Sequence, residues 1–467
     1  MRQKRHQPVA SRVRAASWLA GVLASAALAL PVFANPFETE LANGMKVVVK
    51  EDRRAPSVVH MVWYGAGAMD EVDGTSGVAH VLEHMMFKGT EAVGPGEFNK
   101  IVASVGGRDN AFTSHDYTAY YQQVPADQLA RVMRLEADRM TGLRLTDEDF
   151  AKEVEVVKEE RRMRTDDKPR ALVFEELMAT AFHAHPYRRP VIGWMSDLDH
   201  MRPADARAWY DRWYVPQNAT LVVVGDVDHE AVFKEAQAVY GGIAPRAALP
   251  SRPIIEEPPR RGLRRVTVSA PAELPYVVMA WAAPTLRQVD ADQDVYALQV
   301  LAAVLDGYSG ARLSRHVVRE AQVAVSAGAG YDGIGRGPQL FYMDGSPAAG
   351  KRVSDVEAAL RAELARIQTD GVGQAELARV KTQAVSSRVF QNDSLMAQAM
   401  EIGALESVGL SWRDEAAMLE GIRRVTAEQV RQVANRYFSD DTLTVAVLDP
   451  LPMNEATPRR PSVPVRH

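Results

Sequence analysis

The chain of 467 residues contains no cysteine. It therefore cannot form disulfides, and any metal site must be built from histidine and carboxylate side chains. Hydrophobic residues make up 46% and charged residues 25% of the chain, a composition typical of a folded protein with a sizeable core. The formal net charge is only −5, so the composition gives no reason to expect nucleic acid or an anionic membrane as a partner.

Long hydrophobic runs are lacking except near the N-terminus. Residues 1–34 have a basic start, then an apolar, alanine-rich run from Trp18 to Leu30, then Val32-Phe33-Ala34, with small residues at the usual cleavage positions. This pattern predicts a signal peptide that is cleaved near Ala34, and a periplasmic or secreted protein without membrane attachment after cleavage. The alternatives are an uncleaved anchor, for which the apolar run is short, and an organelle presequence.

Strand and helix patterns are mixed along the rest of the chain. Strands gather early in each half, and amphipathic helices follow them. This order favours an α+β fold of antiparallel-rich sheets covered by helices over repeated β-α-β units. The main expected elements are a hairpin over 37–49, strands over 57–64 and within 108–124, and helices over 77–87, 126–141 and 146–164.

The second half of the chain repeats the first in outline. A helix over 204–214 leads through a turn to a strand at 220–226, and a helix over 428–438 leads to a strand at 442–449, about 220 residues later. This predicts two homologous domains joined by a proline- and arginine-rich linker. The expected boundaries are a signal peptide at 1–34, an N-terminal domain at 35–243, a linker at 244–262, a C-terminal domain at 263–452 and a polar tail at 453–467.

The most informative motif is His80-Val81-Leu82-Glu83-His84. On a helix, positions i, i+3 and i+4 share one face, so both imidazoles and the carboxylate point into the same small volume. Two imidazoles suit Zn²⁺, and a glutamate beside them can activate a metal-bound water. The order is that of the inverted zinc motif His-x-x-Glu-His. The alternative is a helix that carries two histidines by chance.

The motif and its flanking residues, together with two segments further along the chain, match the sequence of a known protein family. The run from His80 to Thr90, the stretch from Gly106 to Tyr120 and the helix from Glu153 to Glu160 resemble the pitrilysin, insulinase and mitochondrial processing peptidase family of zinc metallopeptidases. The resemblance implies one Zn²⁺ per chain, with Glu160 as the third ligand after His80 and His84. Glu159, its neighbour, is the competing candidate. Adjacent helical side chains point about 100° apart, so only one of the two can face the metal.

The resemblance also implies roles around the metal. Glu153, seven residues before Glu160, is expected to support the site from behind the ligands, or else to be an ordinary solvated helix charge. The strand with Asn110, Ala111 and Phe112 is expected to receive substrate as an added strand. For Asn110 the alternative is a residue that satisfies a turn.

The family places an arginine and a tyrosine in the C-terminal half, over the zinc. Arg319 fits the arginine, but Val325 stands at the tyrosine position. The chain therefore departs from the pattern, and Tyr331 is either a substitute or part of a hairpin turn. Short family members often work as pairs, so the resemblance implies a hetero-oligomer with a zinc-less paralogue, or a homodimer.

Together these features predict an exported zinc metalloendopeptidase that cleaves peptides or unfolded segments, with Glu83 as general base, as part of a two-subunit chamber. The alternative is a catalytically silent scaffold or assembly subunit of the same family.

Overall fold

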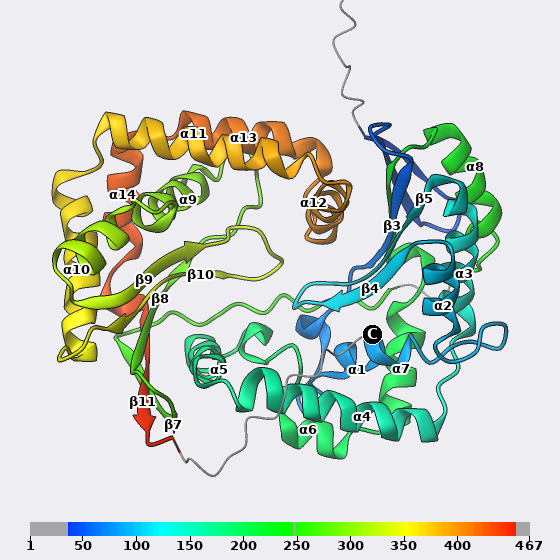
Figure 1. The fold of residues 1–467 in the computed structure, drawn as a ribbon, viewed down its shortest axis with the longest axis horizontal. Helices are drawn as coiled ribbons and strands as arrows, with labels where there is room; N and C mark the ends of the chain where they lie inside the picture. Colours follow the sequence, from blue (N-terminus) through cyan, green and yellow to red (C-terminus); the bar gives the residue numbers. More distant parts are fainter. Residues whose placement is uncertain (1–35, 246–248, 454–467) are drawn as a thin grey trace, which may run out of the picture. The chain divides into compact units, whose positions relative to one another are not determined.

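Two β-sheets, one in each half of the chain, organise the computed structural model (Figure 1). The structure describes residues 36–245 and 249–453, and these residues fall in one unit that starts at Pro36. The predicted signal peptide, residues 246–248 of the predicted linker and nearly all of the predicted tail lie outside the described residues. In the described part of the chain, no helix is both long enough and apolar enough to cross a membrane.

The N-terminal sheet has six strands in the order β1-β2-β6-β3-β5-β4. The β2 and β6 strands are parallel, and all other neighbours are antiparallel. Seven of the eight residues of β3 are buried, because both faces of the sheet are covered. The strands are β1 (Phe37–Glu40), β2 (Lys46–Glu51), β3 (Ser57–Tyr64), β4 (Arg108–Thr113), β5 (Thr118–Pro125) and β6 (Ala219–Gly225).

The C-terminal sheet has five strands in the order β7-β11-β8-β10-β9. Its order matches β2-β6-β3-β5-β4 strand for strand, and its one parallel pair, β7 with β11, takes the place of β2 with β6. This confirms the predicted α+β fold with two homologous domains. The strands are β7 (Arg264–Pro271), β8 (Tyr276–Ala283), β9 (Ala324–Tyr331), β10 (Gln339–Pro347) and β11 (Leu443–Leu451).

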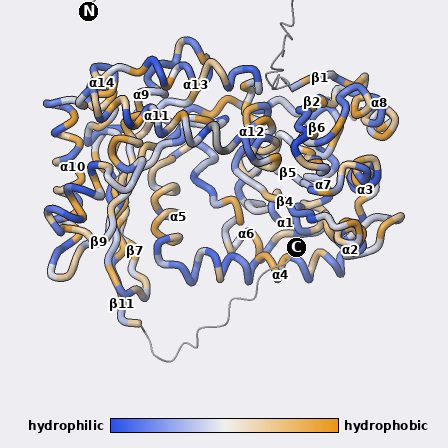
Figure 2. Tube along the Cα trace, turned by 45° about the horizontal axis from the view of Figure 1, so that its top comes forward, coloured by the Kyte–Doolittle hydropathy of each residue, from blue (hydrophilic) through white to orange (hydrophobic). Residues whose placement is uncertain are grey.

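Helices cover both sheets. Along α10, the buried residues Val356, Leu360, Leu364 and Ile367 recur every three or four positions, and the tube in Figure 2 alternates between hydrophilic and hydrophobic colours accordingly. The described helices are α1 (Val78–Met85), α2 (Glu97–Ser104), α3 (Leu129–Gly142), α4 (Asp147–Arg161), α5 (Pro169–Ala181), α6 (Met195–His200), α7 (Pro203–Trp213), α8 (His229–Val239), α9 (Gln293–Asp306), α10 (Val353–Asp370), α11 (Gln374–Gln391), α12 (Leu395–Ser407), α13 (Glu415–Arg424) and α14 (Ala427–Tyr437).

The two halves exchange one helix each. Helix α12 of the C-terminal half packs on β3 and β6, where Ile402 joins Met61 and Trp63 in one buried cluster. Helix α5 of the N-terminal half packs on β7 and β11, as Figure 1 also shows. Each large apolar side chain buried in this way contributes about 1.5–3 kcal/mol, so the exchange ties the halves together. Residues 249–261, between the halves, contain neither helix nor strand, and the predicted domain boundaries stay a prediction.

A polar junction joins the halves at the turn between β9 and β10. Arg336 donates from both Nη atoms to the Asp70 carboxylate, at 2.7 and 2.9 Å, and its backbone N–H donates to Asp116 at 3.1 Å. The Tyr187 hydroxyl donates to Asp116 at 2.6 Å and accepts from the Gly337 N–H at 2.9 Å. The C-terminal hairpin is therefore held by side chains of the N-terminal half.

A substitution at Gly403 tests whether α12 packs on the N-terminal sheet as described. A methyl group added there collides with the buried Trp63 ring, so Gly403→Ala is expected to lower the free energy of unfolding by about 1–3 kcal/mol despite the better helix propensity of alanine. Urea denaturation measures the change. Gly373→Ala, which meets no atom within 4 Å, is the matched control. A Gly403→Ala protein as stable as wild type would show that α12 does not pack as described.

His185 makes the stability depend on pH. Its Nδ1 accepts from the Tyr187 N–H at 3.2 Å, and burial lowers the pKa of His185 to about 4. The unfolded chain binds this proton near pH 6.5, so the stability that neutral His185 provides is lost as the pH falls from about 6.5 towards 4. His185→Asn keeps an acceptor but cannot titrate. Between pH 7 and 4, wild type is expected to lose about 1–3 kcal/mol more unfolding free energy than this variant. Equal losses would contradict the assignment.

Candidate metal centre

The helix that carries the inverted motif is fixed at its first turn by a buried carboxylate. Gly77 adopts a left-handed conformation with φ of 88°, and all eight residues of α1 are buried. The Glu71 carboxylate accepts from the N–H groups of Gly77 and Ala79, both at 2.9 Å, and burial raises the pKa of Glu71 to about 8. Glu71 thus supplies acceptors for the backbone N–H groups at the start of α1.

Three buried side chains from two helices meet next to α1. His80 and His84 lie one turn apart, with ring centroids at 4.8 Å, and Glu160 reaches them from α4. Glu160 Oε2 lies 3.2 Å from His84 Nε2 and 3.8 Å from His80 Nε2. Ligand atoms around a tetrahedral zinc with bonds of about 2.0–2.1 Å lie about 3.3 Å apart, so the distances and the donor types fit zinc.

The structure separates the two candidates for the third ligand. The Glu160 side chain is 1% exposed and faces the histidines, whereas the Glu159 side chain is 40% exposed and pairs with Arg162. The two groups have distinct environments because adjacent helical residues point about 100° apart. The geometry therefore favours Glu160.

A second group of ligand-type side chains lies elsewhere. Among the described residues, Glu51, Asp228 and His229 also come close together, but they are less buried than the first group. The Glu51 carboxylate accepts from both the backbone N–H and the ring Nδ1 of His229, at 3.0 and 2.8 Å. These contacts explain why the three side chains lie together: Glu51 binds the first residue of α8, and no metal is needed to account for the group.

Glu153 lies beside the ring of His84. Its Oε2 is 3.4 Å from His84 Nδ1, on the opposite side of the ring from Glu160, and its Oε1 pairs with Lys88 Nζ at 2.5 Å. Burial acts to raise the pKa of Glu153, but the bonds from His84 and Lys88 hold it below the usual value. A carboxylate in this place fixes the orientation of the ring, leaving His84 Nε2 towards Glu160.

The charges at the cluster are strongly coupled. Burial opposes both ions, but the bonds from Glu153 and Glu160 raise the pKa of His84 to about 9. The bond from His84 and the nearby charges lower the pKa of Glu160 to about 2. The two shifts have one cause, the close contact between the His84 imidazole and the Glu160 carboxylate.

Glu83 lies between the two histidines in sequence and is 4% exposed. Burial raises the pKa of Glu83 to about 7, opposed by the Thr113 hydroxyl, which donates to its Oε2 at 2.5 Å. A carboxylate with a pKa near neutrality suits a general base. Thr113 was not predicted as a site residue, although it lies in the stretch from Gly106 to Tyr120 that resembles the family.

The predicted substrate strand is the edge strand β4, so one of its sides has no neighbouring strand in the sheet. Because side chains alternate along a strand, Ala111 and Thr113 face α1, whereas Asn110 and Phe112 face the other side, where Phe112 packs on Trp63. The Asn110 side chain accepts from the Ala111 N–H at 2.8 Å. Contact with a substrate at this edge would therefore be made through the main chain.

The three C-terminal residues singled out in the sequence lie on the π-helical turn after α9 and on β9. Arg319 is exposed on a π-helical turn (Leu313–Glu320) that contacts β9, α9 and α10, and Val325 is 53% exposed on β9. The Tyr331 hydroxyl donates to the Pro284 carbonyl at 2.6 Å, which supports the hairpin interpretation. The structure thus brings together His80, Glu83, His84, Glu153 and Glu160.

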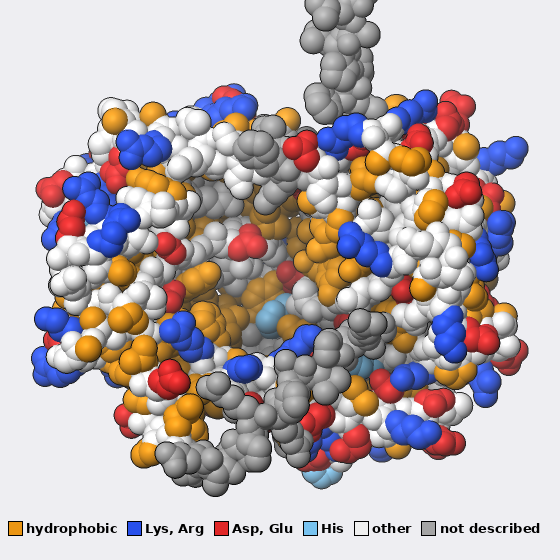
Figure 3. Space-filling view, viewed as in Figure 1, with side chains coloured by type: hydrophobic (Ala, Val, Ile, Leu, Met, Phe, Trp, Pro, Cys, Tyr) orange, Lys and Arg blue, Asp and Glu red, His pale blue; other side chains and the backbone are white. Residues whose placement is uncertain are grey.

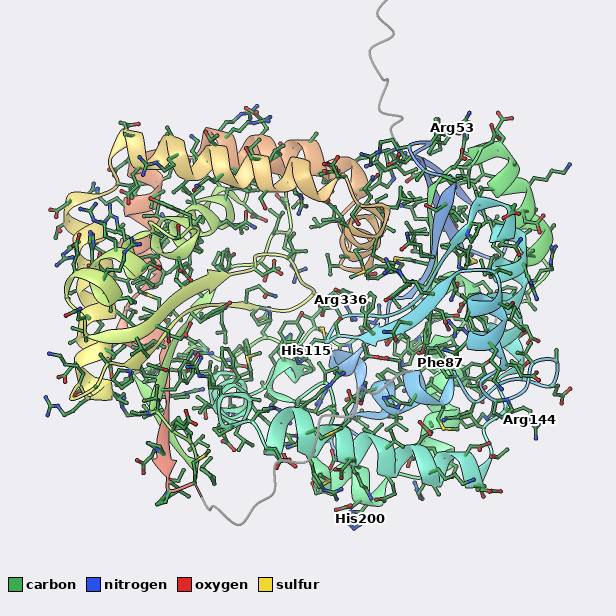
Figure 4. All side chains as sticks on the ribbon, in the orientation of Figure 1. Arg53, Phe87, His115, Arg144, His200 and Arg336 are labelled. Carbon is green, nitrogen blue, oxygen red and sulfur yellow. The ribbon has the colours of Figure 1, made fainter. Side chains whose placement is uncertain are left out.

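A cavity of about 330 Å³ opens where β4 ends. Residues 114–117 of the β4–β5 turn line one side, and Asp332, Glu401 and Leu405 of the C-terminal half line the other. Figure 3 shows a hollow near the middle of this view, with apolar, acidic and histidine side chains visible in it. Figure 4 labels His115 in the turn after β4 and Arg336 at the tip of the β9–β10 hairpin, whose backbone N–H donates to Asp116 of the same turn.

The fold and the site define a class of two-domain proteins in which one domain carries an inverted His-x-x-Glu-His motif. Residues 46–194 match the model of the insulinase family, peptidase family M16, and residues 200–384 match the model of the peptidase M16 inactive domain. The chain belongs to this family. The inactive-domain match includes α9, which takes the place of α1 in the C-terminal half and lacks the motif.

Relatives and solved structures agree with this assignment. The chain is 28% identical over 418 residues to the zinc protease PqqE of Helicobacter pylori, covering 88% of this chain and 92% of the relative. It is 29% identical to an uncharacterized zinc protease of Mycobacterium bovis, covering 91% and 95%. A protease structure from Helicobacter pylori has a TM-score of 0.84 at 27% identity and covers 89% of this chain and 100% of that chain.

The periplasmic protease PqqL of Escherichia coli shares the fold, with a TM-score of 0.75 at 20% identity. The match covers 89% of this chain but 47% of the Escherichia coli chain, so that protein is about twice as long.

Metal analysis of two neighbouring variants tests the third ligand. Glu160→Gln is expected to weaken zinc binding by at least about 100-fold, because it removes a charged ligand, while Glu159→Gln leaves binding unchanged. Equilibrium competition against a chromophoric chelator measures the affinity. Loss of zinc in Glu159→Gln alone would overturn the assignment of Glu160.

Proposed function

We propose that this chain is an exported zinc metalloendopeptidase that cleaves peptides or unfolded protein segments. The buried cluster of His80, His84 and Glu160, with Glu83 beside it and an open strand edge next to it, carries the proposal. The names of the relatives, which are zinc proteases, support it.

In this proposal His80, His84 and Glu160 hold one Zn²⁺ per chain. When bound, the ion supplies a Lewis acid that polarises a peptide carbonyl and lowers the pKa of water. Glu153 holds the His84 ring from behind, and Lys88 holds Glu153 in turn. The half-buried Lys88 thereby offsets part of the charge that three nearby carboxylates place around the two imidazoles.

Glu83 acts as the general base. It takes the proton from the attacking water and later gives it to the leaving amine. The bond from Thr113 holds the Glu83 carboxylate towards β4. This contact places the proton acceptor beside the strand on which the substrate would lie.

The substrate lies as an extended strand along the free edge of β4, beside Asn110 and Ala111. The Asn110 side chain now bonded to the Ala111 N–H would give way to a substrate carbonyl. A peptide that runs past Thr113 reaches the cavity at the β4–β5 turn. An edge strand accepts extended chains, which supports peptides and unfolded segments over folded proteins as substrates.

Export and pairing complete the proposal. Cleavage near Ala34 would release the mature chain into the periplasm or outside the cell, with residues 244–262 linking its two domains. We propose a hetero-oligomer with a zinc-less paralogue that supplies the missing tyrosine contact, a homodimer being the alternative. The exposed Val325 and the double length of the Escherichia coli protease support two such units working together.

A catalytically silent scaffold or assembly subunit is the second candidate. The valine at position 325 favours it, because the tyrosine that the family places over the zinc is then missing from this position. The complete buried cluster favours catalysis, because an assembly role gives no reason to keep charged ligands in the interior, where unpaired charges are costly.

Cleavage of a quenched peptide library by the mature chain, alone and with its zinc-less paralogue, tests the function. We expect activity that a chelator removes and added zinc restores. Glu83→Gln is expected to lower kcat by at least about 100-fold while zinc affinity stays within a few-fold of wild type, because Glu83 moves protons and is not a ligand.

Thr113→Val, which removes the hydroxyl but keeps the size of the side chain, is expected to have a smaller effect of about 10-fold. If zinc-loaded wild type cleaves no peptide even with the paralogue, the scaffold function is correct and the peptidase function is wrong.

A further inference from the structure

Arg164 forms an ion pair with Glu160, one of the three side chains of the buried cluster. It follows α4 on a short π-helical turn (Arg162–Asp166), four residues after Glu160. Its Nη1 lies 2.7 Å from Glu160 Oε1, while Glu160 Oε2 faces the two histidine nitrogens at 3.2 and 3.8 Å. The carboxylate is thus divided, with one oxygen towards the imidazoles and the other towards the guanidinium.

The two partners differ sharply in exposure. The Glu160 side chain is 1% exposed, whereas that of Arg164 is 66% exposed. The guanidinium therefore approaches the buried Glu160 carboxylate from the solvent side. π-Helical turns are rare and are frequently found at functional sites.

Each carboxylate that contacts His84 has its own cation. Lys88 pairs with Glu153, which contacts His84 Nδ1, and Arg164 pairs with Glu160, which contacts His84 Nε2. The ring of His84 is held between two carboxylates that are themselves held by charges. Groups that orient a ligand in this manner change metal affinity by about 10–100-fold when removed.

We infer that Arg164 is a positioning residue for the metal: it holds Glu160 Oε1 so that only Oε2 is presented to the ion. The inference rests on the proposed zinc site. Arg162 offers a contrast in the same turn, because it pairs with Glu159 at 3.1 Å and both side chains are more than a third exposed. Such a surface pair contributes little.

Two effects of removing Arg164 oppose each other. The guanidinium repels a divalent cation, so its loss alone would tighten binding, but screening of a side chain that is two-thirds exposed keeps this effect small. A Glu160 carboxylate without its partner can rotate and loses its fixed orientation. Orientation is the larger effect, so weaker zinc binding is expected.

Zinc dissociation constants of full-length mature variants test the inference, measured by competition with a chromophoric chelator. Arg164→Met is expected to weaken zinc binding by about 10–100-fold. Arg164→Lys, which restores a cation four residues from Glu160, is expected to regain most of this loss, and Arg162→Met is expected to bind as wild type. Arg164→Gln replaces Arg164→Met if the latter does not fold.

Co²⁺ provides a readout that does not depend on activity. The visible absorption of the Co²⁺-loaded protein is expected to change in Arg164→Met and to match wild type in Arg162→Met, because only the first alters how Glu160 meets the ion. Equal or tighter zinc binding by Arg164→Met, in a wild type that binds zinc, overturns the role of Arg164 alone. A wild type that binds no zinc overturns the proposed metal site itself.

Discussion

The arrangement of the site depends on keeping one carboxylate charged in the interior. Glu160 is almost fully buried, and a buried charge costs several kcal/mol unless partners surround it. Two histidines on one face of α1 meet one oxygen, and Arg164 meets the other. Helix α1, which carries both histidines, is itself buried along its whole length, and the Glu71 carboxylate accepts from the N–H groups at its start.

The two halves of the chain have the same sheet order but contribute differently to the site. The two sheets share one strand order, but α9, which takes the place of α1 in the C-terminal half, has mainly apolar residues and no histidine. The exchange of α5 and α12 means that each half completes the core of the other. The C-terminal half thus supports the fold and lines the cavity at the end of β4, and among the residues that the structure describes all three members of the cluster come from the N-terminal half.

The features that depend only on neighbouring residues could be predicted from the sequence. His80, Glu83 and His84 lie about one helical turn apart, so helix periodicity predicts that they share a face. The apolar run of residues 57–64 likewise predicts strand β3. Glu160 required the family resemblance, since it lies 76 positions beyond His84 and periodicity carries no information over that distance. Thr113 and Arg164 were missed because one is set by strand pairing and the other by a π-helical turn. The helix exchange is likewise a long-range packing effect.

X-ray absorption at the zinc K-edge of the loaded mature chain tests the central claim most directly. We expect one ion per chain in a four-coordinate shell at about 2.0–2.1 Å, with the multiple-scattering signature of two imidazoles. The expected shell comes from His80, His84, one Glu160 oxygen and one further light atom. A six-coordinate shell without imidazole scattering, or no retained zinc, would contradict it.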